Sequence, residues 1–169
     1  NYSDNLGGAA RATFRIHKSL LNEGYNSTLY VNKKNTKDNS IKTSPYMIDK
    51  NFYNIRTNLI SKFVKVTNPR IKSYNSPSIL PSSWPKFINN SDIDLVHLNW
   101  INAEMMSIED IAKIKKPMIW TFHDMWPICG VEHYSDTFEY RDGYKKKRFF
   151  DLYHSTWQRK KKLNNKIKI

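Results

Sequence analysis

Two short apolar runs in the middle of the chain are followed by polar side chains. Asn99 lies at the end of the run 93–100, and His123 and Asp124 come directly after the run 117–122. A histidine in such a place can hydrogen-bond a hydroxyl group or transfer a proton, and a neighbouring aspartate can orient it or accept a proton. The structural alternative is an aspartate that caps the next turn, beside a histidine whose hydrogen bonds are satisfied.

A pair of glycines near the N-terminus could bind an anion. Gly7 and Gly8 precede a stretch with helical periodicity, so backbone N–H groups and the positive end of a helix dipole would be open to a ligand there. The third glycine of the dinucleotide-binding fingerprint is missing, and no Gly-Lys-Ser/Thr follows as in a P-loop. An ordinary tight turn is therefore the alternative interpretation.

The pattern of histidines and cysteines predicts no metal site. His123 and His133 are ten residues apart, without a further histidine at helical spacing, and Cys129 is the single cysteine. One cysteine also excludes an internal disulfide and fits a reducing compartment, so the cytoplasm is the expected location. We expect neither a metal nor another cofactor.

Positive charge is concentrated towards the C-terminus. The formal net charge is +13 and the pI is about 9.7. Residues 141–169 hold eleven Lys or Arg and two Asp, which places +9 of the charge in this stretch. Such asymmetry is typical of a surface for a membrane, a nucleic acid or a phosphorylated ligand, and equally of a solvated helix face. Interleaved aromatic side chains favour nucleic acid among these partners, namely Tyr144, Phe149, Tyr153 and Trp157.

Hydrophobic periodicity predicts alternating helices and strands. Helices are expected over 9–23, 47–66, a short stretch from 107, and 151–163. Strands are expected over 27–31, 93–100 and 117–122, and 166–169 resemble the start of another. Gly24 should end the first helix and Ser107 should cap the third. Residues 32–44 and 69–85 are polar or rich in proline, so they are expected to be irregular.

The helix expected over 47–66 is strongly amphipathic. Its apolar residues step by three or four positions, and they are Ile48, Phe52, Ile55, Leu59 and Phe63. We expect this face to pack against a sheet, and contact with a membrane is the less favoured alternative because only part of the circumference is apolar.

The predicted elements favour a single α/β domain. The strand, helix and strand within 93–122 form a βαβ unit, which implies a Rossmann-like parallel sheet with right-handed crossovers and helices on both faces. Ligands of such sheets bind beyond the carboxyl ends of the strands, where Asn99, His123 and Asp124 are expected. No apolar run approaches the roughly 18 residues that a membrane-spanning helix needs.

The order and spacing of the motifs resemble a known family. LGGAARATFRIHKSLLNEGYNSTLYV, residues 6–31, resembles the opening helix and second strand of bacterial glycosyltransferases of family 4, which are retaining enzymes with the two-domain GT-B fold. DLVHLNWIN, followed by KKPMIWTFHDMWPICGVEHYS, resembles the paired strands and the HDMWP signature of that family. The resemblance covers most of residues 6–165.

The resemblance implies that residues 1–169 are most of an N-terminal, acceptor-binding domain. The first strand and the C-terminal domain that binds the nucleotide are missing, so this fragment is expected to be inactive alone. The implied reaction transfers a sugar from a nucleotide-sugar donor to a glycan or lipid-linked acceptor, with retention, in surface polysaccharide biosynthesis. The expected location is the cytoplasm. The charge of the basic helices adds a further possibility, that they dock such an enzyme on anionic lipid at the inner face of the cell membrane.

The resemblance also assigns candidate site residues. The glycine loop of the family, near the donor diphosphate, maps onto Gly7 and Gly8, and its sugar-contacting histidine maps onto His123. Asp124 is the second candidate catalytic residue. Further candidates for substrate binding match motif positions and are Arg11, Asn99, Trp126 and His133. A basic module that binds nucleic acid or a membrane surface is the alternative function, whereas the enzyme itself should have no specific nucleic-acid partner.

Overall fold

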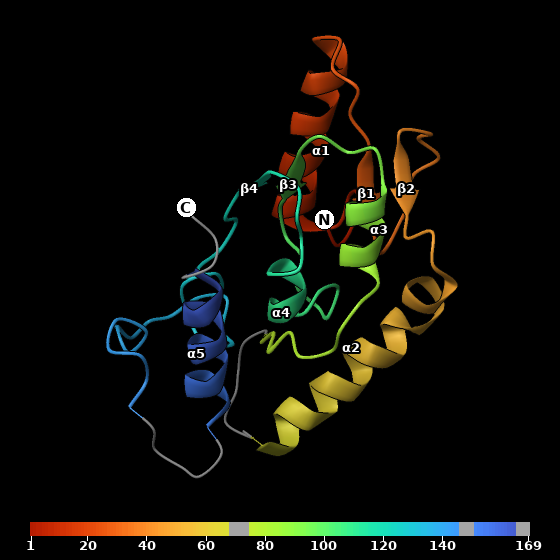
Figure 1. The fold of residues 1–169 in the computed structure, drawn as a ribbon. Coiled ribbons are helices and arrows are strands. Elements are labelled where there is room, and N and C mark those ends of the chain that lie inside the picture. The colour runs from red at the N-terminus through yellow and green to blue at the C-terminus, as the bar shows by residue number, and fades with distance from the viewer. Residues whose placement is uncertain (68–74, 146–150, 165–169) are drawn as a thin grey trace.

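The computed structural model describes residues 1–67, 75–145 and 151–164. The chain consists of short strands and helices (Figure 1). The elements are α1 (Gly7–Asn22), β1 (Leu29–Val31), β2 (Ile41–Thr43), α2 (Met47–Thr67), α3 (Trp84–Asn90), β3 (Val96–Leu98), α4 (Ile108–Ile111), β4 (Met118–Trp120) and α5 (Leu152–Asn164). The strand-like ending expected at 166–169 lies outside the described residues.

The strands form two parallel pairs. In the first pair Leu29 of β1 lies opposite Ile41 of β2, and in the second Val96 of β3 lies opposite Met118 of β4. The expected mixed α/β structure with parallel strands is confirmed. In the described residues the two pairs are separate, because no regular strand lies between β1 and β3. One Rossmann-like sheet with its first strand missing stays a prediction.

Residues 1–3 connect the two pairs. The Tyr2 N–H donates to the Trp100 carbonyl beyond β3, at 2.7 Å, and the Tyr2 carbonyl accepts from the Lys33 N–H beyond β1, at 2.9 Å. Ser3 also forms a parallel bridge with Lys33. A single short stretch of backbone therefore fixes the ends of β1 and β3 relative to each other.

The sequence-based expectations were wrong for two elements, β2 and α3. Residues 32–44 were expected to form a loop, but Ile41 is 1 % exposed and its strand pairs with β1. Residues 69–85 were expected to be irregular, but α3 starts at Trp84 with Pro85 in its first turn. Proline is favoured there because the first turn of a helix does not need its N–H group.

The predicted helix boundaries at Gly24 and Ser107 are confirmed. Gly24 has φ +83°, in the left-handed region that favours glycine, and the next N–H, of Tyr25, donates back to the Leu20 carbonyl at 2.9 Å. Ser107 Oγ accepts from the Asp110 N–H at 3.1 Å, and Asp110 Oδ2 accepts from the Ser107 N–H at 3.2 Å. This reciprocal pair is a capping box, which explains how a helix as short as α4 begins at a defined residue.

The largest hydrophobic core lies between the second strand pair and helices α3, α4 and α5. α3 contributes Trp84 and Ile88, and β3 contributes Leu98. α4 and α5 supply Ile108, Ile111 and Leu163, and the loop after β4 supplies Trp126. This core holds β3 and β4 in place, so the residues at their carboxyl ends are positioned by buried contacts.

The face that α2 turns towards the protein differs from the expected one. Ile60 and Val64 are buried against Val131 and Leu152. Phe52, Ile55, Leu59 and Phe63 are exposed, so the expectation that they pack against a sheet is wrong. The side chain of Ile48 lies outside the described residues. Within the described ranges, no helix is long and apolar enough to cross a membrane.

Candidate functional site

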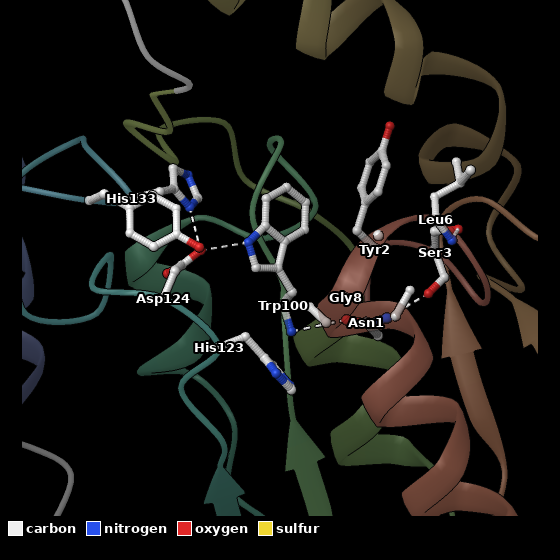
Figure 2. A pocket seen from close by; sticks show the side chains of 13 residues that line it. Asn1, Tyr2, Ser3, Leu6, Gly8, Trp100, His123, Asp124 and His133 are labelled. Atoms are coloured by element: carbon white, nitrogen blue, oxygen red, sulfur yellow. Dashed lines mark hydrogen bonds and ion pairs between the residues drawn. The ribbon is translucent and has the colours of Figure 1, made fainter.

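A pocket of about 460 Å³ lies where the ends of β3 and β4 meet the N-terminus of α1. This size is within the range of small-molecule sites. Figure 2 shows side chains from these segments facing the hollow. The lining residues come from three segments and are Asn1, Tyr2, Ser3, Leu6, Gly7, Gly8, Ala9 and Ala10, then Trp100, then His123, Asp124, His133 and Tyr134.

The start of α1 leaves backbone donors open on one side of the pocket. Leu6 occupies the N-cap position, no side chain caps the helix, and its first turn has no acidic residue. Gly7 has φ +86°, and a Cβ at Gly7 or Gly8 would meet nothing within 4 Å. A ligand can thus approach the N–H groups closely, and the positive end of the helix dipole favours an anionic one.

His123 stands across the pocket and has a defined tautomer. Its Nε2 lies 2.9 Å from Asn99 Oδ1, an oxygen that only accepts, so Nε2 carries the proton and donates. Burial lowers the pKa of His123, and the Asp124 charge opposes this shift only in part, so the ring is neutral at pH 7. Nδ1 is therefore an acceptor, and in the described part of the chain no protein group bonds it. A ligand hydroxyl can donate to this atom.

Asp124 collects hydrogen bonds from three donors. Oδ2 accepts from Trp100 Nε1 at 2.8 Å and lies 2.5 Å from His133 Nδ1, while Oδ1 accepts from the Trp126 N–H at 3.0 Å (Figure 2). Partial burial raises the pKa of Asp124, but the bonds from His133, Trp126 and Trp100 outweigh it and bring the pKa below its ordinary value. The carboxylate is ionised and orients Trp100 and His133. Its expected role as a proton acceptor stays a prediction.

His133 links the pocket to a buried serine. Its Nδ1 faces Asp124, and its Nε2 lies 2.9 Å from Ser76 Oγ. The order Ser76, His133, Asp124 matches the connectivity of a nucleophilic triad. Ser76 is 2 % exposed and does not line the pocket, so its hydroxyl cannot attack a ligand there. We interpret this chain of bonds as an anchor for the His133 ring.

The structure brings together five of the eight predicted site residues. Gly7, Gly8, His123, Asp124 and His133 line one pocket. Asn99 lies behind it, buried, and reaches the pocket through His123.

The two other predicted residues lie elsewhere. Arg11 is exposed one turn along α1, with Nε 3.4 Å from the Gly7 carbonyl, and it does not line the pocket. Trp126 is 1 % exposed, packs in the main core and donates from Nε1 to the Ser76 carbonyl at 2.6 Å. Its indole presents no surface to a ligand in the pocket.

Some lining residues escaped the sequence analysis. Tyr2 and Ser3 face the pocket because residues 1–3 lie between β1 and β3, and three residues are too few to show any periodicity. Tyr134 follows His133 and is exposed, and no pattern in the sequence marks it. Ser76 lies 57 positions from its partner His133, so no local spacing could pair them.

The pocket combines the open backbone N–H groups of α1, the neutral His123 ring and the ionised Asp124 carboxylate. In the ranges that the structure describes, no group of three or more His, Cys, Asp or Glu side chains is arranged to hold a metal ion. Burial raises the pKa of the Cys129 thiol to about 11, and the thiol does not line the pocket. The residues suit binding of a phosphorylated, hydroxyl-rich molecule between α1 and His123.

One of three comparisons with known proteins finds a match. No curated protein and no solved structure shows a significant match to the chain. The family model described as Glycosyltransferase Family 4 matches residues 6–166, nearly the whole chain. The match includes α1, both strand pairs and the loop that carries His123 and His133. The chain therefore belongs to glycosyltransferase family 4.

Proposed function

We propose that this chain is the acceptor-side half of a retaining glycosyltransferase. Family membership implies a nucleotide-sugar donor, an acceptor and one Rossmann-like half of a GT-B fold. In our proposal a second domain grips the nucleotide, and the acceptor is a glycan or a lipid-linked sugar of surface polysaccharide biosynthesis. The observation that carries this proposal is the pocket with open N–H groups of α1 on one side and His123 on the other.

Each side of the pocket has a part in the proposed reaction. The leaving diphosphate gains negative charge as the glycosidic bond to it breaks, and the N–H groups at Gly7 and Gly8 can stabilise that charge. The neutral His123 ring accepts a hydrogen bond at Nδ1 from a hydroxyl of the transferred sugar, which fixes the anomeric carbon near the acceptor. Asp124 holds Trp100 and His133 along the wall, and Trp100 offers an aromatic face to the sugar ring.

The alternative of a nucleic-acid-binding module finds little support in the basic stretch. Tyr144 is buried, with its hydroxyl bonded to Glu132, and Tyr153 packs beside Val131 and Leu152. Trp157 lies against Gly143, where even a Cβ would approach its ring to 2.8 Å. Tyr144 is therefore enclosed in the protein, and Tyr153 and Trp157 are partly buried in packing contacts. Phe149 lies outside the described residues.

A test uses the full-length enzyme with UDP- and GDP-sugars as donors and release of nucleoside diphosphate as the readout. His123→Ala should lower turnover by about 100-fold, because the transferred sugar loses the group that positions it. His97→Ala is the matched control, since His97 lies on the neighbouring strand and does not line the pocket. Normal turnover of His123→Ala would refute the role of His123. An inverted anomeric configuration of the product, measured by NMR, would refute retention.

A further inference from the structure

One side of α2 carries an exposed row of large apolar side chains. Phe52, Ile55, Leu59 and Val66 are 50, 58, 59 and 81 % exposed. Their spacing of three, four and seven residues places them on one side of the helix, and we call these four residues the α2 stripe. Figure 1 shows α2 along the lower right edge of the molecule, with one side away from the other elements. Contiguous exposed apolar rows of this kind are typical of binding surfaces.

The orientation of α2 is fixed from its opposite side. The Arg56 guanidinium donates to the carbonyls of Pro81, Leu80 and Glu104, at 2.6, 2.7 and 3.1 Å. Thr57 Oγ1 donates to the Ala103 carbonyl at 3.0 Å. Ile60 and Val64 add the apolar contacts described above. Because these contacts hold the helix, rotation about its axis cannot bury the α2 stripe.

The exposed charged side chains of α2 next to the α2 stripe are lysines. Lys62 and Lys65 are exposed beside it. The acidic residue of α2, Asp49, is 5 % exposed and accepts hydrogen bonds from Ser44 and Ser83 inside the protein. The outer side of the helix therefore combines apolar side chains with lysines, on a chain whose formal net charge is +13. This combination is typical of a helix that lies in the interface of an anionic membrane.

We propose that the α2 stripe inserts into the surface of an anionic lipid bilayer, with α2 parallel to the membrane plane. Phe52, Ile55, Leu59 and Val66 would enter the boundary between headgroups and acyl chains. Lys62 and Lys65 would extend along this boundary and bind lipid phosphates with their ammonium groups. This inference is independent of the proposed chemistry, because α2 contributes no residue to the pocket.

A second copy of the chain is a less suitable partner for the same surface. Two copies that met through the α2 stripe would bring their lysines together, and each copy carries a net charge of +13. Like charges across an interface oppose association, whereas an anionic bilayer attracts the same lysines. The positive charge therefore favours an anionic bilayer over a second copy of the chain as the partner of the α2 stripe. The apolar side chains alone would suit either partner.

The test is sedimentation of the full-length protein with vesicles of phosphatidylcholine alone or mixed equally with phosphatidylglycerol. We expect binding to the anionic vesicles that weakens with salt. The double variant Ile55→Ser/Leu59→Ser should lower this binding at least about tenfold, because it removes two inserting side chains. Lys62→Gln/Lys65→Gln should also lower it about tenfold or more, since each lysine near such a surface contributes roughly fivefold.

The matched control is Ile16→Ser/Leu20→Ser, the same residue types at the same spacing on α1, where both are partly exposed. This variant should bind like the parent. Equal binding by the α2 variant, or no binding of the parent to anionic vesicles at low salt, would overturn the proposal. A parent that is dimeric and an α2 variant that is monomeric in analytical ultracentrifugation would also overturn it.

A second measurement does not depend on loss of binding. Leu59→Cys can be labelled with an environment-sensitive dye, because the native Cys129 is buried. We expect a blue shift of its emission with anionic vesicles, and unchanged emission would contradict insertion. Circular dichroism of each variant checks that the helices are intact.

Discussion

Asp124 is the residue on which the hydrogen bonds of the pocket wall converge. Asp124→Asn keeps the size of the side chain but replaces one acceptor oxygen with an NH₂ donor. In the parent protein three N–H donors point at the Asp124 carboxylate. In the variant one of these donors would face the NH₂ group of the new asparagine, which also donates. We expect the free energy of unfolding, measured by urea denaturation, to fall by about 2 kcal/mol. Turnover should fall about 100-fold, because Trp100 and His133 lose their orientation.

The control for Asp124→Asn is Asp136→Asn, which changes an exposed carboxylate near the same loop. It should leave both stability and turnover unchanged. If Asp124→Asn lowered turnover without any loss of stability, Asp124 would act on the substrate directly, as the sequence-based prediction has it. If it changed neither quantity, both interpretations of the carboxylate would be wrong.

The individual site residues could be predicted to different extents. His123 and Asp124 follow an apolar run, and a residue that follows a parallel strand lies at the edge where ligands bind. Trp126 stands two positions later in the same motif, but its environment depends on Ser76, fifty positions away, whose carbonyl accepts from its indole. A local motif therefore predicts which residues are near the pocket, and the tertiary contacts decide which of them face it.

At the scale of elements, Lys160 attaches α5 to the loop that follows β4. Its Nζ donates to the carbonyls of Trp126, Cys129 and Gly130 and lies 3.7 Å from the centre of the Trp126 ring. Burial lowers the pKa of Lys160 well below its ordinary value. Three carbonyls that would otherwise be buried without donors are thus satisfied by one side chain, and α5 is fixed close to the loop that carries His133.

Lys160→Met should lower the free energy of unfolding by about 3 kcal/mol. Methionine retains the apolar length of the side chain but removes all three donors, so buried carbonyls lose their partners. The measurement is urea denaturation followed by circular dichroism. Lys162→Met is the control, because Lys162 is exposed on the same helix, and it should change stability by less than about 0.5 kcal/mol. A loss of the same size in both variants would contradict the anchoring role of Lys160.

The ends and the existence of helices could be predicted from neighbouring residues, whereas the face of a helix that packs could not. α1 was predicted with its end at Gly24 because a glycine in the left-handed region ends a helix whatever surrounds it. The existence of α2 was predicted from its periodicity, but the face that packs was not. Its buried apolar side chains among the described residues are Ile60 and Val64, and their partners Val131 and Leu152 are more than sixty positions away. β2 was not predicted, because three residues are too few for an alternation of apolar and polar side chains to be distinguished from a loop.

At the scale of the whole molecule, small polar contacts hold α1 to the first strand pair and join that pair to the second. His17 on α1 lies 2.8 Å from Ser27 Oγ before β1 and 2.9 Å from Ser40 Oγ before β2. Tyr2 continues the connection from β1 to Trp100 after β3. The Rossmann-like arrangement could be inferred from the βαβ pattern, but this division into two pairs could not, because it depends on which backbone groups meet across the gap.

Histidines near these junctions should make the stability of the molecule depend on pH. Burial lowers the pKa of His17, His97 and His123 below the ordinary value of about 6.5. Between pH 7 and 5.5 the unfolded chain therefore binds more protons than the folded one, so the free energy of unfolding should decrease as the pH falls. Glu104 opposes this trend, because burial raises its pKa and the folded chain holds that proton to higher pH, but it is one group against three. Urea denaturation at pH 7.0, 6.0 and 5.5 measures the trend, and NMR titration of the histidine rings measures its cause. Stability that was constant or rose on acidification would contradict the assignment of neutral, at least partly buried rings to these positions.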